Sequence, residues 1–192
     1  MRLFPVMELD KHCAKGPYAI RSLYFDDIDD SAYFDKVGGV MHRDKYRIRI
    51  YNCSDASIKL ERKKKFGSYI FKEAATLTRD EVYKILDGDY DFLLKSQYSL
   101  CREFYYECVS NVMRPRTIVD YDREPYVADE GTVRITFDMD VRAAIGSYDI
   151  FDDTLPVLPV LEPGKVVMEV KYTEFLPQVL REVLPDRASE FT

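Results

Sequence analysis

The sequence predicts an α+β fold, an antiparallel β-barrel with a wet lumen and with helices packed outside it. Segments with the period-two alternation of β-strands lie on both sides of a region with helical character. Several of these segments carry charged side chains on one face and apolar side chains on the other. A water-filled barrel beneath outer helices would satisfy both faces. The length of 192 residues suits a single domain over residues 1–192.

The stretch from residue 41 to residue 51 has the clearest alternation and is expected to be a strand. Adjacent cations on one face of a strand repel one another unless water or an anion lies among them. The opposite, apolar face can pack on a core. This strand therefore predicts a barrel or deep groove that holds a polyanion. The cationic face consists of Arg43, Lys45, Arg47 and Arg49, and the apolar face consists of Tyr46, Ile48 and Ile50.

The other elements of the N-terminal half follow from β-branched and aromatic composition and from turn residues. In the strand after the first turn, Ile58 and Leu60 share one face. Its other face carries Lys59, Glu61, Lys63 and Lys65. The expected elements are a strand at 18–26, a short helix at 28–36, a turn at 52–56, a strand at 57–65 and its continuation at 67–72.

In the C-terminal half, Thr78 and Glu81 have the spacing of a capping box, which predicts the start of a helix. Gly88 is expected to end it. Pro115 is expected to close the next helical region, because the residue before a proline disfavours helical geometry. The expected elements are a helix at 78–86, a mainly helical segment at 90–113, strands at 117–123, 132–138 and 165–172, a loop at 149–163 and a helix at 174–184.

The later strands repeat the pattern of a charged face opposite an apolar face. Arginine is always charged, and its planar guanidinium matches phosphate oxygens. The alternative is that these strands form the solvated face of an open sheet. Recurrence of the same alternation in five strands favours a site that surrounds a chain of phosphates. The cations from those strands are Arg47 with Arg49, Lys63, Arg123, Arg134 and Lys171.

Glu61 and Glu169 are acidic residues placed among these cations. A surface carboxylate beside a lysine is usually an ion pair of small energetic value. Within a phosphate site, a carboxylate can instead hold Mg²⁺ or Mn²⁺ that bridges phosphate oxygens. Glu169 is the better metal candidate because fewer charges crowd it along its strand. Glu61 lies between Lys59 and Lys63 and is expected to orient them.

Charge and motif content narrow the function classes. The net charge is −6, but residues 43–72 hold ten basic and three acidic residues, so this segment carries +7 and the remainder −13. This asymmetry indicates a localised anion site, whereas a protein that coats nucleic acid would be basic overall. Four cysteines without CxxC spacing and two histidines disfavour a zinc site and predict reduced thiols in the cytoplasm. No apolar run has the length of a membrane span, and no P-loop, GxGxxG or GxSxG motif occurs.

Six motifs in collinear order resemble those of the VTC domain, the polyphosphate polymerase domain. The resemblance covers about residues 18–177, nearly the whole chain. Each motif alone is weak, but six in the same order are specific. The motifs are YAIRSLYFD at 18–26, KYRIRIY at 45–51, LERK at 60–63, VDYDR at 119–123, VRITFD at 133–138 and MEVKY at 168–172.

This resemblance implies the triphosphate tunnel fold, an eight-stranded antiparallel barrel shared with the CYTH enzymes. It also implies transfer of the terminal phosphate of ATP to a polyphosphate chain, with Mn²⁺ or Mg²⁺ as cofactor and Glu169 as the metal ligand. The implied catalytic residues are Arg47, Arg49, Lys63, Arg123, Arg134 and Glu169. The implied substrate-binding residues are Arg43, Lys45, Tyr121 and Lys171.

The chain departs from the family pattern at both ends. Members usually begin with a strand carrying an ExK-type motif, and a helix follows before the strand at 18–26. Residues 7–10 are interpreted as the end of that helix, and a C-terminal SKY strand is also missing. The barrel is therefore expected to lack its usual first strand and to be incomplete at both ends.

Two other functions stay open at this point. One is a CYTH-like inorganic or nucleoside triphosphatase, and the other is a non-catalytic module that binds polyphosphate or inositol phosphates. The expected partners are ATP and polyphosphate. Nucleic acid is not expected, and a membrane-associated partner is left open.

Overall fold

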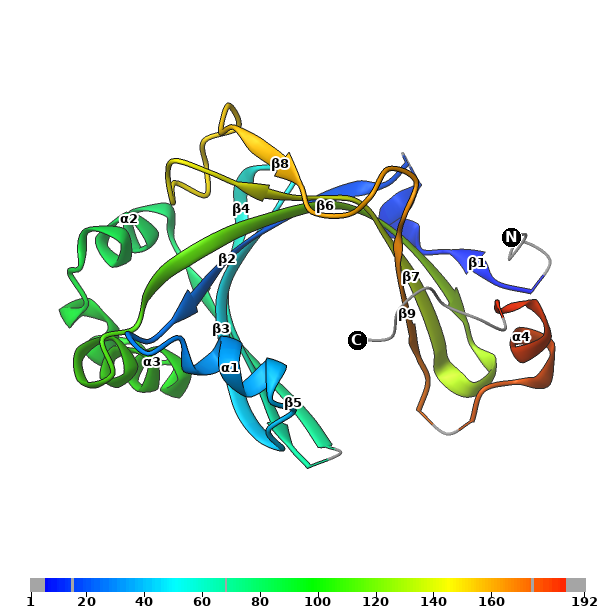
Figure 1. Cartoon of the computed structure of the whole chain (residues 1–192), viewed down its shortest axis with the longest axis horizontal. Helices are drawn as coiled ribbons and strands as arrows, with labels where there is room; N and C mark the ends of the chain where they lie inside the picture. Colours follow the sequence, from blue (N-terminus) through cyan, green and yellow to red (C-terminus); the bar gives the residue numbers. More distant parts are fainter. Residues whose placement is uncertain (1–5, 15, 68, 174, 186–192) are drawn as a thin grey trace. The chain divides into compact units, whose positions relative to one another are not determined.

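The structure is a computed structural model that describes residues 6–14, 16–67, 69–173 and 175–185 (Figure 1). The chain divides into two compact units, and each is described by itself. Unit 1 comprises residues 1–18, 121–141 and 161–192, and unit 2 comprises residues 19–120 and 142–160. Within the described residues, mostly antiparallel strands and four α-helices make the fold α+β.

The elements have the following bounds. The strands are β1 Glu8–Leu9, β2 Tyr18–Asp26, β3 His42–Tyr51, β4 Ser54–Phe66, β5 Tyr69–Leu77, β6 Arg114–Ala128, β7 Val133–Ala144, β8 Val157–Pro159 and β9 Val167–Lys171. The α-helices are α1 Ser31–Val37, α2 Arg79–Asp87, α3 Ser99–Ser110 and α4 Gln178–Val183. Short 3₁₀ helices are η1 Lys11–Cys13, η2 Asp91–Lys95 and η3 Glu130–Thr132.

In unit 2, the sheet runs in the order β5, β4, β3, β2, and the first part of β6 follows β2. The register places Ile48 of β3 opposite Leu23 of β2 and opposite Leu60 of β4. Because directly opposite residues point to the same face, these apolar side chains form one layer. The short strand β8 pairs with the end of β7, where Ala144 lies opposite Val157.

The apolar layer of unit 2 packs against α2, η2 and α3. Phe104 of α3 meets Phe25 edge-on, with ring centroids 5.1 Å apart, and lies 5.3 Å from the ring of Tyr46. The helix at 79–87 begins with the expected capping box, in which Thr78 and Glu81 cap each other's backbone N–H groups. The core also contains Ile48, Ile50, Ile58, Leu60, Val82, Ile85, Leu93 and Leu100.

Unit 1 has a smaller core of its own. The later part of β6 lies beside β7, while β1 pairs with β6 and β9 pairs with β7. Ile135 of β7 lies opposite Val170 of β9, so both point to the same face. They pack with Leu180 of α4, and with Met7 and Tyr126. The expected apolar faces of the strands at 132–138 and 165–172 are therefore confirmed.

Two expectations about local structure are wrong. Residues 8 and 9 are not the end of a helix, because Glu8 and Leu9 form a strand opposite Val127 and Tyr126. The segment 90–113 is mainly helical, as expected, and consists of η2 followed by α3, which ends at Ser110. Pro115 does not close a helix, because it lies inside β6, whose 15 residues extend well beyond the expected strand at 117–123. A proline is tolerated near a strand end because its missing N–H leaves few ladder bonds unmade there.

The helix expected at 174–184 begins at Gln178, with Pro177 as its N-cap residue, and Glu174 lies outside the described residues. The proline-bearing loop also contains the short strand β8, which was not expected. The strand order ends at β5 and at β8, and no pairing joins these two edges in the described ranges. The sheet is therefore open, in agreement with the incomplete barrel that the sequence predicted. None of the described helices has the length and apolar character required to span a bilayer.

Candidate functional site

The cationic face predicted for β3 is present in unit 2. Across the ladders, Arg47 lies opposite Glu61 of β4 and opposite Tyr24 of β2. Lys45 lies opposite Lys63, which lies opposite Lys72 of β5. Opposite residues share a face, so four strands contribute to one polar surface. We call it the cationic face and define it by Arg43, Lys45, Arg47, Arg49, Glu61, Lys63 and Lys72.

Glu61 is the buried centre of the cationic face, and its side chain is only 5% exposed. Arg47 donates from Nε to Glu61 Oε2 at 2.7 Å, and Lys72 Nζ lies 2.6 Å from Oε1. The Arg49 guanidinium is 4.0 Å from the same carboxylate. Glu61 does not orient Lys59 as expected, because Lys59 donates to Thr76 instead. The partners of Glu61 lie on the neighbouring strands β3 and β5. The sequence of β4 alone does not indicate them.

The surroundings of Glu61 keep it ionised. Burial alone would raise its pKa, but the hydrogen bond from Lys72 and the charges of Arg47 and Arg49 outweigh burial. The pKa of the Glu61 carboxyl therefore lies below its ordinary value. A carboxylate that stays charged can hold the guanidinium groups in fixed positions at neutral pH.

Two residues of β2 that were not singled out from the sequence also hold these arginines. Tyr24 Oη accepts a hydrogen bond from Arg47 at 3.0 Å, and the guanidinium carbon of Arg47 lies 5.8 Å from the centre of the Tyr24 ring. Ser22 Oγ accepts from Arg49 Nε at 3.1 Å. The alternation of β2 could have indicated both residues, because Ser22 and Tyr24 share a face and Leu23 between them points to the core.

Lys45 lies in a region of excess positive charge. Its pKa is lowered first by burial and then by the charges of Lys36 and Arg43, and Lys63 acts in the same direction. Asp26 opposes this shift. The neighbouring positive charges disfavour the protonated form of Lys45. An anion that binds beside Lys45 would therefore be stabilised.

Unit 1 brings together a second set of expected residues. Arg123 forms a two-bond pair with Asp138, with donor–acceptor distances of 2.6 and 2.7 Å. Its guanidinium carbon lies 5.2 Å from the centre of the Tyr121 ring. Burial would lower the pKa of Arg123, but the hydrogen bonds to Asp138 raise it, so the guanidinium stays charged. Asp138 shares the expected face of β7 but was not predicted to be the partner of Arg123.

The remaining residues of this set are more exposed. Arg134 Nη2 lies 3.4 Å from Asp10 Oδ2, and 41% of the Arg134 side chain is exposed. Lys171 Nζ lies 3.3 Å from Glu169 Oε1, and both side chains are largely exposed. Arg134 lies opposite Lys171 in the β7–β9 ladder, so the two cations share a face.

Glu169 has a second oxygen donor beside it in the β7–β9 ladder. Thr136 Oγ1 is buried and has no hydrogen-bond partner among the described residues, and Thr136 lies directly opposite Glu169 in the ladder. A carboxylate and a hydroxyl are oxygen donors of the kind that Mg²⁺ and Mn²⁺ prefer. In the part of the chain that the structure describes, no three His, Cys, Asp or Glu residues gather into a metal cluster. The two oxygen donors present, the Glu169 carboxylate and the Thr136 hydroxyl, are of a type that fits Mg²⁺ or Mn²⁺.

The sequence-predicted residues fall into two sets, and each unit brings its own set together. Unit 2 holds Arg43, Lys45, Arg47, Arg49 and Lys63, and unit 1 holds Tyr121, Arg123, Arg134, Glu169 and Lys171.

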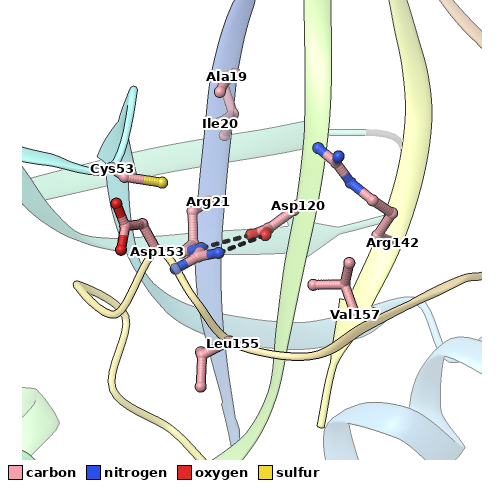
Figure 2. Close-up of a pocket in the computed structure, with 9 residues that line it drawn as sticks. All are labelled: Ala19, Ile20, Arg21, Cys53, Asp120, Arg142, Asp153, Leu155 and Val157. Carbon is pink, nitrogen blue, oxygen red and sulfur yellow. Dashed lines mark hydrogen bonds and ion pairs between the residues drawn. The ribbon is translucent and has the colours of Figure 1, made fainter.

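Two buried arginines outside these sets are structural. Arg21 binds both oxygens of Asp120 at 2.8 Å and donates to the carbonyls of Ile150 and Asp152, which fixes the loop before β8 (Figure 2). Arg62 follows Glu61 in β4, so its side chain points to the other face of the sheet. There it binds Glu73, Glu103 and Tyr46. In the ladders, Arg21 lies opposite Ile50 and Arg62 lies opposite Tyr46, so both point away from the cationic face.

A cavity of about 210 Å³ lies beside Arg21 in unit 2. Figure 2 shows Leu155, Val157 and Arg142 around the Arg21–Asp120 pair. None of the residues predicted from the sequence for the phosphate site lines this cavity, so it is separate from the cationic face.

One known protein family matches nearly the whole chain. The family model described as the VTC domain matches residues 1–190. No curated protein matches the chain.

Two solved structures show weak similarity. One is a proposed adenylate cyclase from Bacillus halodurans, with 12% identity, a TM-score of 0.41, and coverage of 67% of this chain and 59% of that protein. The other is the PH1819 protein from Pyrococcus horikoshii OT3, with 13% identity, a TM-score of 0.43, and coverage of 94% and 74%. This chain therefore spans less than two thirds of the Bacillus halodurans protein. Similarity at this level supports no conclusion about chemistry.

Proposed function

Because the chain belongs to the VTC domain family, we propose that it is a polyphosphate polymerase domain that transfers the terminal phosphate of ATP to a polyphosphate chain. The observation that carries the proposal is the cationic face, where arginines and lysines from β3, β4 and β5 surround one buried carboxylate, Glu61. Phosphoryl transfer requires positioning and charge stabilisation more than covalent participation of the protein. Fixed guanidinium groups supply both.

In this proposal Arg47 and Arg49 bind phosphate oxygens. Glu61 and Tyr24 hold the Arg47 plane, so little side-chain entropy is lost when a phosphate binds. Lys45 and Lys63 add charge at the same face. A bound phosphate would offset the repulsion that now lowers the pKa of Lys45.

In unit 1, Arg123, Arg134 and Lys171 are the proposed phosphate-binding cations, and Tyr121 supports Arg123 through its ring. Glu169 and Thr136 would hold Mn²⁺ or Mg²⁺ together with phosphate oxygens. When bound, such a metal neutralises charge on the phosphate oxygens. Lys171 lies beside Glu169, with its Nζ 3.3 Å from Glu169 Oε1.

The proposed partners are ATP and polyphosphate, and the proposed location is the cytoplasm. ATP is available there, and thiols stay reduced there. All four cysteines of this chain are free thiols, and three of them are buried. This is consistent with a reducing compartment.

The test combines catalysis and binding on the same protein. The chain is incubated with ATP and Mn²⁺, and acid-labile polymer and orthophosphate are measured. Binding of tripolyphosphate is measured by isothermal titration with and without metal. The variant Arg49→Ala removes one cation of the cationic face, and Lys95→Ala removes an exposed lysine of η2 as a matched control.

Polymer that is formed by the native chain and by Lys95→Ala, but not by Arg49→Ala, supports the proposal. Release of orthophosphate without polymer would instead favour a CYTH-like triphosphatase, in which water is the acceptor. Tight tripolyphosphate binding that is indifferent to metal, without turnover of ATP, would favour the non-catalytic binding module. If Arg49→Ala and Lys95→Ala bind tripolyphosphate equally, the cationic face is not the phosphate site.

A further inference from the structure

We propose that the end of the β4–β5 hairpin, together with α1, docks on the surface of an anionic lipid bilayer. This end of unit 2 carries an apolar surface that the phosphate site does not use. We call it the hairpin patch and define it by Val37, Met41, Phe66, Tyr69, Ile70 and Phe71. Every one of these side chains is more than half exposed, with values from 57% for Phe66 to 69% for Tyr69.

The residues of the hairpin patch are contiguous. Phe66 and Tyr69 face each other across the end of the hairpin, and the ring of His42 stacks on Phe66 with centroids 4.1 Å apart. The N–H of Gly67 donates to the carbonyl of Met41 at 3.0 Å, which fixes the loop after α1 against the hairpin. Helix α1 lies along β3 at this end of the sheet (Figure 1). Because side chains alternate along β5, Tyr69 and Phe71 lie on the face of Phe66, whereas Ile70 lies on the other face with Lys65. The hairpin patch therefore covers both sides of the hairpin end.

The exposure of this patch contrasts with the rest of the same strands. Farther along β3 and β4, Ile48 and Leu60 are fully buried beneath the helices, and Tyr46 is covered by Phe104. The apolar residues of the hairpin end have no such cover in the described residues. Contiguous exposed apolar surface of this kind marks an interaction site more often than a solvated one.

The charges around the patch are mainly positive. Lys36 precedes Val37 on α1, Arg43 follows His42, and Lys64 lies opposite Phe71 in the ladder. Lys65 adds a further cation opposite Ile70. The nearby acids are Asp35 on α1 and Asp44, which lies 3.8 Å from Lys64. Cations around aromatic and aliphatic side chains complement a surface that is both apolar and anionic.

An anionic bilayer fits these features better than a second copy of the chain. In a two-fold contact between copies, the cations around each patch would face the same cations of the partner. At a bilayer, Phe and Tyr lie among the headgroups and lysines near the surface gain about 1 kcal/mol each from anionic lipid. The occupant that these observations favour is therefore a membrane surface rich in acidic phospholipid.

The test measures co-sedimentation of the full chain with vesicles of phosphatidylcholine, alone or with about one third phosphatidylserine. One variant replaces the aromatic residues of the patch, as Phe66→Ser with Tyr69→Ser and Phe71→Ser. A second removes charge, as Lys36→Gln with Lys64→Gln. The matched control is Tyr106→Ser with Val109→Ser, which removes exposed apolar residues from α3 instead, 60% and 53% exposed. Circular dichroism, tripolyphosphate titration and sedimentation velocity accompany each protein.

We expect the native chain and the α3 control to bind the phosphatidylserine vesicles and to bind phosphatidylcholine weakly. Both patch variants should lower the bound fraction about tenfold while keeping their fold, and the aromatic variant should also keep its affinity for tripolyphosphate. The proposal is overturned if the native chain binds neither vesicle, or if the control loses as much binding as the patch variants. It is equally overturned if the native chain is a dimer that the aromatic variant dissociates, because a second copy would then cover the patch.

Discussion

At the scale of residues, the environment of Glu61 explains how several cations can share one face of a sheet. A buried carboxylate with Arg47 and Lys72 as direct partners offsets part of their mutual repulsion. It also restricts the orientation of the Arg47 guanidinium, which Tyr24 contacts from β2. Removing a cation next to Glu61 would leave a buried charge with fewer partners. Such a substitution therefore changes the stability of unit 2 as well as phosphate binding.

The lowered pKa of Glu61 predicts how stability depends on pH. A carboxyl group whose pKa is lower in the folded state stabilises the fold above its unfolded pKa, and this contribution is lost as pH falls through the folded pKa. Glu61→Gln should therefore destabilise the protein by about 2 kcal/mol or more at pH 7, and the difference from the native chain should shrink below about pH 4. Urea unfolding at several pH values measures this.

The control for the Glu61 variant is Glu162→Gln, which removes a carboxylate that is 76% exposed and paired with Lys165 at the surface. It should leave the free energy of unfolding almost unchanged at every pH. A constant difference between Glu61→Gln and the native chain across the whole pH range would contradict the assignment of a lowered pKa.

Arg134 offers a cleaner test of phosphate binding, because its side chain is 41% exposed and its partner Asp10 also accepts from the backbone N–H of His12. We expect Arg134→Ala to weaken tripolyphosphate binding about tenfold. The free energy of unfolding should change by less than about 1 kcal/mol. Isothermal titration and urea unfolding give the two values. Unchanged affinity would remove Arg134 from the proposed site.

At the scale of elements, β3 separates two functions by its alternation. One face supplies Arg47 and Arg49, and the other supplies Ile48 and Ile50 to the core under α2 and α3. The core face anchors the strand, so the cationic face is carried on a rigid support. Substitutions on the two faces should therefore have different consequences.

Ile48→Asp should unfold unit 2, because it places an unpaired charge at a fully buried position. Ile48→Val at the same position should cost only about 1 kcal/mol, since it removes a single methylene. Circular dichroism and thermal unfolding distinguish the two variants. A folded Ile48→Asp protein would show that this face of β3 is not the core face.

At the scale of the whole molecule, the sequence concentrates net positive charge in one short segment. Residues 43–72 carry +7 while the rest carries −13. Such a distribution attracts a polyanion to one region while the remainder repels it. It also gives the hairpin patch cationic neighbours in a chain that is acidic overall.

This distribution predicts a strong dependence of tripolyphosphate binding on salt. Raising the salt concentration from about 0.05 M to about 0.5 M should weaken binding by at least about tenfold, because screening shortens the range of the attraction. Titration with KCl measures this, and potassium glutamate at the same ionic strength is the control for a specific chloride effect. Affinity that is independent of salt would contradict a binding site built mainly from charge.

Local sequence information predicted much of this protein. Alternation alone assigned both faces of β3 and β4, turn residues placed the first hairpins, and Thr78 with Glu81 marked the start of α2. These features depend on neighbours within a few residues, so a linear sequence contains them. The collinear motifs likewise identified the VTC domain family, which the match over residues 1–190 confirms.

Only the tertiary structure decided which charges pair with one another. Glu61 binds Arg47 and Lys72 rather than its neighbours along β4, Arg123 binds Asp138, and Pro115 lies in a strand rather than at a helix end. These outcomes depend on ladder register and on contacts between strands that are distant in sequence. Period-two alternation specifies the face of a side chain but not the residue that lies opposite it. That residue is determined by the register between neighbouring strands, which the local sequence does not contain.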